Sequence, residues 1–219
     1  DWSKVVPGDT SATLWTEYLP LDSLATFLNP ECGFVFNTNN AGFEATCEDN
    51  NSALPDFNQH IGYREEFNNR SLRFYEMMDN EYLNKFIDFE DFKKIKFDHT
   101  YPERLTFKGD IWLDDMFELS EEKYPDIADA IQRIKAFDHE ADTNDRNFPI
   151  MMFAVYEMLK SPGSLRDSAE TNKEKREKLF VMCIRKAKEH MLKHFETIDV
   201  PLGKVQILER NGREYGLAG

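Results

Sequence analysis

The chain of 219 residues carries a formal net charge of −14 and is 41% hydrophobic, with 18 Phe. That much apolar side chain can bury a core, so disorder of the whole chain is excluded. The negative charge would repel phosphate groups and therefore disfavours nucleic acid and anionic membranes as partners. No apolar run reaches the roughly 18 residues that a membrane-spanning helix needs, which disfavours a transmembrane protein.

The charge is spread unevenly along the chain. Lys4 is the only base within residues 1–60, whereas Lys and Arg are concentrated in residues 173–193. Two interpretations stay open: these are solvated faces that attract each other, or the acidic part is a cavity mouth or a docking surface. The chain begins with Asp1 rather than Met, so we expect a fragment or a processed product of a longer protein.

Three cysteines allow at most one disulfide within the chain. Cys32 and Cys47 are close enough in sequence to pair in an oxidising compartment, and the sequence leaves open whether they do. Cys183 falls inside a helical pattern, so we expect it to be a small buried hydrophobic residue. The cysteine spacings do not match a zinc site.

Residues 1–60 are predicted to be loop-rich, because Pro, Gly, Asn and Asp are frequent there. Residues 33–38 are a short apolar stretch that favours a strand bounded by turns. From about Tyr63 onward, apolar residues recur at the spacing of helices. A helix is predicted over residues 72–82, and Asp88 favours the N-cap of the next one.

Four further helices are predicted from apolar periodicity. Residues 109–119 form a short amphipathic candidate, and a helix opened by Pro125 extends over 125–137. Residues 148–160 are nearly all apolar, which indicates a buried helix, and a Ser-Pro-Gly sequence at 161–163 stops it. Residues 172–195 have an apolar stripe and a basic face. Such a helix suits a membrane or partner element, but the acidity of the rest favours packing on the core.

A β-hairpin is predicted over residues 204–217, because Asn-Gly at 211–212 supplies the two positive φ angles of a type I′ turn. The expected fold class is therefore α+β and predominantly α-helical. We expect a loop and strand segment over 1–60, a helical domain over 61–200 and a C-terminal hairpin over 201–219.

Few patterns indicate metal or cofactor chemistry. His190 and His194 lie one turn apart on a predicted helix, a spacing that can hold a metal ion, but the sequence marks no third ligand. Gly-rich phosphate loops and the common hydrolase and zinc-protease motifs are absent from the sequence.

The most informative segment is residues 29–40, which read Asn-Pro-Glu-Cys-Gly-Phe-Val-Phe-Asn-Thr-Asn-Asn. Alone, it indicates an Asn-Pro turn and a strand that ends in turn-forming asparagines. It resembles the pattern Asn-Pro-x-x-Gly-aromatic-aliphatic-x-Asn-x-Asn in the β chain of the penicillin acylase family of N-terminal-nucleophile amide hydrolases. Residues 69–73 and 91–98 resemble later helices of that chain. Residues 201–206 resemble a segment near its end in the branch of acyl-homoserine-lactone and aculeacin acylases.

The resemblance implies roles for particular residues. Asn39 corresponds to the oxyanion-hole asparagine, whose side-chain amide donates to the negative oxygen that develops during acyl transfer. Arg73 corresponds to an arginine that helps to orient the site, although a surface salt bridge also explains a lone helical arginine. The chemistry implied requires no cofactor. A structural calcium ion is implied, with Glu48, Asp49 and Asn50 as its candidate ligands.

In this family the nucleophile is an N-terminal Ser whose own amine acts as the base. Asp1 does not provide that chemistry, so the resemblance implies that the chain is inactive alone. It implies as partners the α chain and the N-terminal part of the β chain of the same precursor, a small acylated amide as substrate, and a periplasmic or secreted location in a bacterium. The alternative that stays open is a non-catalytic helical interaction domain.

Overall fold

The computed structural model describes residues 5–14, 16–18, 20–21, 24–47, 51, 67–83, 85–107 and 111–219. Within these ranges the fold is α+β and dominated by helices, as predicted. The helices are α2 (Asn69–Met77), α3 (Phe89–Lys96), α4 (Ala128–Lys135), α5 (Phe148–Lys160), α6 (Gly163–Glu170), α7 (Lys173–Phe195) and α8 (Leu202–Val205). A π-helical segment, Met78–Tyr82, extends α2, and 3-10 turns cover Ser11–Thr13, Leu113–Met116 and Pro125–Ile127.

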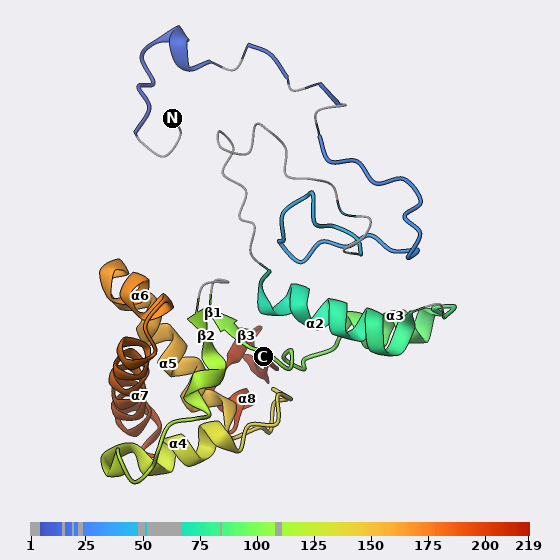
Figure 1. Cartoon of the computed structure of the whole chain (residues 1–219). Helices are drawn as coiled ribbons and strands as arrows, with labels where there is room; N and C mark the ends of the chain where they lie inside the picture. The colour runs from blue at the N-terminus through green and yellow to red at the C-terminus, as the bar shows by residue number, and fades with distance from the viewer. Residues whose placement is uncertain are drawn as a thin grey trace.

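The core of the molecule is formed where α5 packs against α7 (Figure 1). The inner side of α5 contributes Ile150, Met151, Ala154 and Met158, all buried at helical spacing. On α7 the buried stripe consists of Leu179, Phe180, Val181, Cys183, Ile184, Ala187 and Met191. α6 also packs on α7, and α4 packs on α5, so a compact helical body surrounds these two helices.

Local sequence signals explain where several helices begin. The Asn68 and Asp88 side chains accept the backbone N–H groups of Ser71 and Asp91, which caps α2 and α3. Asn172 caps α7 in the same way. The N-cap predicted at Asp88 is therefore confirmed.

The predicted C-terminal hairpin is confirmed. β3 (Ile207–Arg210) pairs antiparallel with β4 (Arg213–Gly216), and Asn211 and Gly212 have φ angles of 53° and 69°. The hairpin rests on α8 through a close approach, since a Cβ on Gly216 would lie 2.6 Å from the Gly203 carbonyl oxygen. A larger residue at Gly216 would separate the two elements.

Two local predictions are wrong. Residues 33–38 form no named strand: their Phe36 N–H donates to Ala45 O at 2.9 Å, but no ladder continues from this bond among the residues that the structure describes. The described part of the range 109–119, residues 111–119, does not form an α-helix. Instead, β2 (Ile111–Trp112) pairs with β1 (Thr106–Phe107), and a 3-10 turn follows. An apolar periodicity over so few residues fits a strand and a turn equally well, and tertiary packing decides between them.

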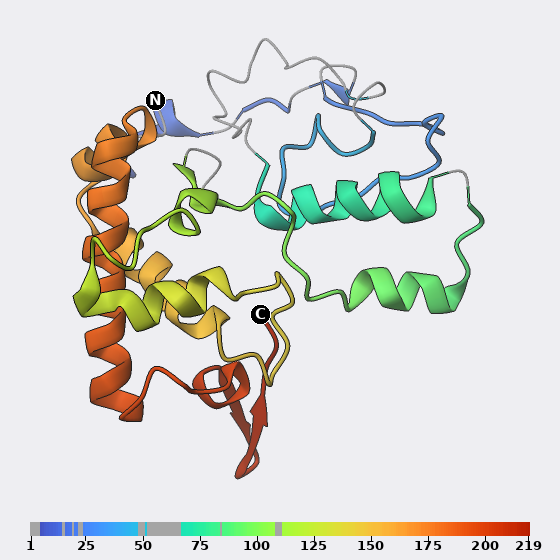
Figure 2. The same cartoon turned by 60° about the horizontal axis from the view of Figure 1, so that its bottom comes forward.

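The helical body and the N-terminal segment occupy different parts of the molecule. In two views, α2 and α3 lie on the side away from α6 and α7 (Figures 1 and 2). The described parts of residues 5–47 contain no named strand, and Phe34 and Phe36 contact α2 through Phe74. No helix among the described residues is both long enough and apolar enough to cross a membrane.

Part of the basic face of α7 is neutralised within the chain. Four of its cations pair with the acidic stretch over residues 113–129, each at 2.6 Å: Lys173 with Glu118, Arg176 with Asp115, Arg185 with Asp126, and Lys188 with Asp129. The arrangement favours α7 as a core helix rather than a membrane element.

Arg176 is the best enclosed of these cations. Its side chain is 15% exposed, pairs with Asp115, and donates at 2.9 Å to the carbonyls of Ala169 and Glu170 at the end of α6. We predict that Arg176→Met lowers the free energy of unfolding by about 2 kcal/mol, because a partly buried carboxylate and two carbonyls lose their donor. Urea denaturation of the 219-residue chain measures this change.

Lys178→Met is the matched control, since the ion pair of Lys178 among the described residues is with the exposed Glu174 on the same helix. We expect an unchanged urea midpoint for the control. Equal midpoints for both variants would contradict the structural role of Arg176.

Candidate functional site

The candidate site is built on a loop closed by a disulfide, residues 32–47, which we name the asparagine loop. Cys32 and Cys47 are bonded, with their Cα atoms 6.3 Å apart, so the pairing that the sequence left open is formed. Cys183 is the free cysteine, and burial raises the pKa of its thiol to about 11. By the loop-closure argument, a ring of this length stabilises its folded form by about 3 kcal/mol.

Aromatic side chains hold the asparagine loop against α2. The Phe36 ring stacks on Phe74 with centroids 4.4 Å apart, and Phe34 meets the edge of Phe74 at 5.5 Å. Tyr75 contacts Phe36 edge-on at 5.1 Å. This apolar contact explains why the short Gly-Phe-Val-Phe stretch folds here without strand partners.

Hydrogen bonds fix the tip of the loop to the first turn of α2. The Asn68 Nδ2 group donates to Thr38 O at 2.8 Å, while its Oδ1 caps the N–H of Ser71. The Ser71 hydroxyl, fully buried, lies 2.6 Å from the Thr38 hydroxyl. The residue that precedes Asn39 is therefore held by both its backbone and its side chain.

Two of the three asparagines that end the motif stabilise the turn. Asn37 Oδ1 accepts the backbone N–H of Asn39 at 2.9 Å. Asn40 accepts the N–H of Thr38 at 2.9 Å and donates to Glu44 O at 2.5 Å. Both amides are thus used within the loop, as expected of turn-forming asparagines.

Asn39 differs from its neighbours. It is exposed and adopts a φ of 66°, a left-handed conformation that asparagine tolerates better than most residues. Its Oδ1 accepts a hydrogen bond of 2.6 Å from Arg70 Nη2. This bond fixes the orientation of the side-chain amide, with its oxygen toward Arg70. Within the described part of the chain, Asn39 Nδ2 has no hydrogen-bond partner, so both of its N–H groups remain available.

Arg70, which the sequence did not single out, makes the contact with Asn39. Arg73 lies one turn further along α2 and forms a two-point pair with Asp98, at 2.9 and 3.2 Å. The hydrogen bond with Asp98 raises the pKa of Arg73, and Glu76 adds to the effect at 3.7 Å. No hydrogen bond joins Arg73 to Asn39 within the described ranges, so its orienting role stays a prediction. Arg70 lies two residues after Asn68, the N-cap of α2. This position in the first turn of the helix is the sequence signal that could have indicated its contact with Asn39.

Two cavities adjoin this turn of α2. A polar cavity of about 410 Å³ is lined by Arg70, Arg73, Asp98 and others. An apolar cavity of about 240 Å³ shares Asn69 and Tyr101 with it. The first turn of α2, which carries Arg70, therefore borders open space, although Asn39 itself lines neither cavity.

The metal predictions remain without structural support. Glu48, Asp49 and Asn50 lie outside the described residues, and the described ones contain no group of three or more His, Cys, Asp or Glu able to hold a metal ion. The His190 and His194 rings lie 4.4 Å apart. Burial, together with the charge of His194, lowers the pKa of His190.

An asparagine amide oriented by an arginine on a closed loop is an arrangement suited to acyl-transfer hydrolysis. The model of the family described as penicillin amidase matches residues 2–212. The chain belongs to this family, since the match covers most of its 219 residues. The match confirms the family resemblance found in residues 29–40. Family membership implies amidase activity for the full-length protein.

The two arginines of α2 are predicted to behave differently when removed. Arg73→Ala breaks the pair with Asp98, in which both side chains are largely enclosed, and should lower the free energy of unfolding by about 1–3 kcal/mol. Arg70→Ala removes an exposed side chain and should change it by less than about 0.5 kcal/mol. Urea denaturation compares the two variants.

Side-chain amide NMR supplies the complementary measurement. In Arg70→Ala the Asn39 amide should lose its fixed orientation, while Arg73→Ala should leave the Asn39 signals unchanged. Loss of the Asn39 signals in Arg73→Ala alone would show that the orienting arginine is Arg73.

Proposed function

We propose that this chain supplies the oxyanion donor of a penicillin amidase-type acylase that hydrolyses acyl amides. The observation that carries the proposal is the state of the Asn39 amide, whose oxygen is engaged by Arg70 at 2.6 Å while its nitrogen is free among the described residues. A donor that is oriented before the reaction loses little free energy to reorganisation when the negative charge develops.

In the proposed reaction, an N-terminal Ser from a part of the acylase outside these residues attacks the amide carbonyl. Its own α-amine takes the hydroxyl proton, and Asn39 Nδ2–H donates to the resulting oxyanion. The protonated α-amine then gives this proton to the nitrogen of the substrate amide. The carbon–nitrogen bond breaks, the amine product leaves, and an acyl-enzyme remains. Water then attacks the ester, which releases the carboxylic acid and restores the Ser. No cofactor takes part in these steps.

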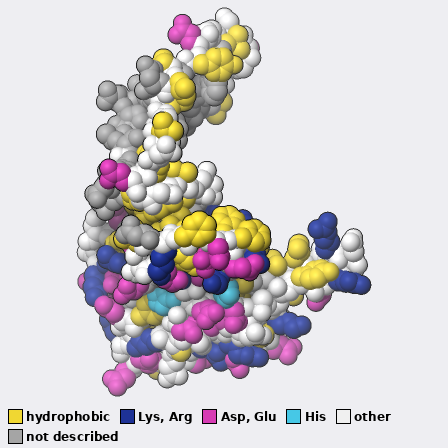
Figure 3. Space-filling model, turned by 90° about the vertical axis from the view of Figure 1, so that its right-hand side faces the viewer, with side chains coloured by type: hydrophobic (Ala, Val, Ile, Leu, Met, Phe, Trp, Pro, Cys, Tyr) yellow, Lys and Arg dark blue, Asp and Glu magenta, His cyan; other side chains and the backbone are white. Residues whose placement is uncertain are grey.

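The proposed partner is the remainder of the same precursor, its α chain and the N-terminal part of its β chain. Four phenylalanines in or near α3 are each more than half exposed in this chain: Phe86, Phe89, Phe92 and Phe97. Such an apolar patch supports a surface that the partner covers in the complete protein. Hydrophobic side chains gather on the face shown in Figure 3, which is the side on which α3 lies in Figure 1.

Several finer assignments belong to the same proposal. The substrate is a small acylated amide, and residues 201–206 favour the branch of acyl-homoserine-lactone and aculeacin acylases. Glu48, Asp49 and Asn50 remain candidates for a structural calcium ion. The Cys32–Cys47 disulfide supports a periplasmic or secreted location, because disulfides persist in oxidising compartments.

Asn39→Asp tests the proposed role in the complete acylase. The carboxylate keeps an oxygen for Arg70 but replaces the Nδ2 donor with an acceptor. We predict that kcat falls by about 10²–10³-fold while KM changes little, because the donor acts mainly on the transition state. Asn39→Gly, which tolerates the positive φ angle, controls for the backbone and should lose a similar factor. Full activity in both variants would exclude Asn39 as the donor.

Reconstitution separates the acylase from a non-catalytic interaction domain. Co-expression of the 219-residue chain with the remaining parts of the precursor should give a stable complex that hydrolyses an acyl anilide. The chain alone should be inactive. A stable complex without amidase activity would favour the interaction domain.

A further inference from the structure

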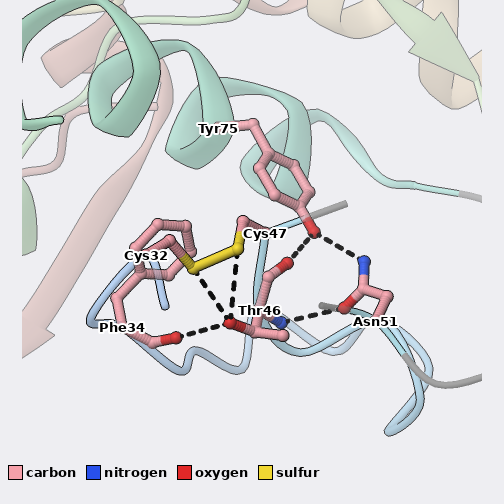
Figure 4. Close-up of a disulfide and its surroundings, with 6 residues drawn as sticks. All are labelled: Cys32, Phe34, Thr46, Cys47, Asn51 and Tyr75. Atoms are coloured by element: carbon pink, nitrogen blue, oxygen red, sulfur yellow. Dashed lines mark hydrogen bonds between the residues drawn. A yellow bond between two sulfur atoms is a disulfide. The ribbon is translucent and has the colours of Figure 1, made fainter. Parts of the chain in front are cut away.

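We propose that the Cys32–Cys47 disulfide positions the Asn39 donor, so that its reduction by a dithiol releases the asparagine loop and lowers catalysis without unfolding the helical body. This inference rests on the proposed function of Asn39. Figure 4 shows the disulfide beside Thr46 and Tyr75. The geometry around these residues links the bridge to α2.

Thr46 connects the disulfide to both ends of the loop. It is fully buried, and its hydroxyl donates to Phe34 O at 2.7 Å and lies 3.2 Å from Cys32 Sγ (Figure 4). Cys47 follows it directly in the chain. The two ends of the asparagine loop are therefore joined twice, once by the disulfide and once by the Thr46 hydroxyl.

The same residue fastens the base of the loop to α2. The Tyr75 hydroxyl donates to Thr46 O, and the Thr46 N–H donates to Asn51 Oδ1 at 3.1 Å. Asn51 Nδ2 in turn donates to the Tyr75 hydroxyl at 3.3 Å. Tyr75 lies one turn beyond Ser71, which holds the tip of the loop at Thr38. One face of α2 thus anchors both the base and the tip.

The disulfide acts on the loop rather than on the core. The main cluster of buried hydrophobic residues extends from Leu105 to Leu202, and the asparagine loop contributes none of its members. When the bridge opens, the ends of the loop gain conformational freedom, and the side-chain amide of Asn39 is held only by hydrogen bonds at the tip, among them the exposed bond from Arg70. We therefore expect a local loss of order.

The chemistry of release is thiol–disulfide exchange. A thiolate of the dithiol attacks one sulfur, the bond between Cys32 and Cys47 breaks, and a mixed disulfide forms. The second thiol of the reductant resolves it. Two electrons and two protons end on the two cysteines, and the dithiol leaves as a cyclic disulfide.

Hydrogen exchange of the 219-residue chain, with and without dithiothreitol, tests the local effect. We expect amides of the asparagine loop to lose protection on reduction while those of α5 and α7 keep theirs. The Cys32→Ser/Cys47→Ser variant should match the reduced chain and show no further response to dithiothreitol. Its one remaining thiol, Cys183, is buried. Unchanged protection in the loop, or loss of protection throughout the chain, would overturn the proposal.

Kinetics of the complete acylase test the link to Asn39. Reduction should lower kcat by about 10- to 100-fold with little change in KM, as misplacement of a positioned group does. In an Asn39→Asp background the same treatment should have almost no effect, because the donor is already lost. An equal fall in both backgrounds, or none in the wild type, would refute a positioning role.

Tyr75→Phe provides a milder variant with the disulfide intact. Loss of the hydroxyl removes the bond to Thr46 O and should give a smaller fall in kcat that also disappears in the Asn39→Asp background. A fall that persists there would contradict the proposal. Full activity of Asn39→Asp itself would instead refute the proposed function. Hydrogen exchange would then be the measurement that tests the effect of the disulfide on the loop.

Discussion

The attachment of the asparagine loop to the first turns of α2 is the interaction on which the candidate site depends. Asn68 and Ser71 hold Thr38, and Arg70 holds the oxygen of Asn39 at 2.6 Å. These contacts come from residues more than twenty positions away in the chain, so the helix serves as a frame for a loop that has no sheet of its own. The orientation of the donor is set by this frame.

The helical body explains much of the charge distribution. Four cations of α7 pair with the acidic stretch over residues 113–129, and the buried stripes of α5 and α7 pack together. The excess negative charge of the protein is therefore left mainly to the N-terminal part, where residues 1–60 contain only one base. A neutral amide such as Asn39 is a suitable donor in such surroundings, because it adds no charge of its own.

Much of the fold follows from local sequence signals, whereas the details of the site do not. Helical periodicity, the cap at Asp88 and the Asn-Gly turn at 211–212 are short-range features, and the structure confirms them. The family follows from residues 29–40. The contact of Arg70 with Asn39, the disulfide, and the pairing of β1 with β2 depend on tertiary proximity. Neither periodicity nor spacing encodes that proximity. The family resemblance points to Arg73, whereas the contact of Arg70 with Asn39 becomes visible only in the structure.

The most direct test of the central claim is a crystal structure of the complete acylase with a transition-state analogue, such as a phosphonate, bound to its nucleophile. We predict that Asn39 Nδ2 lies about 2.7–3.1 Å from the anionic oxygen of the analogue, with its Oδ1 still bonded to Arg70. An Asn39 side chain turned away from that oxygen, with a different group as the donor, would contradict the proposed role of this chain.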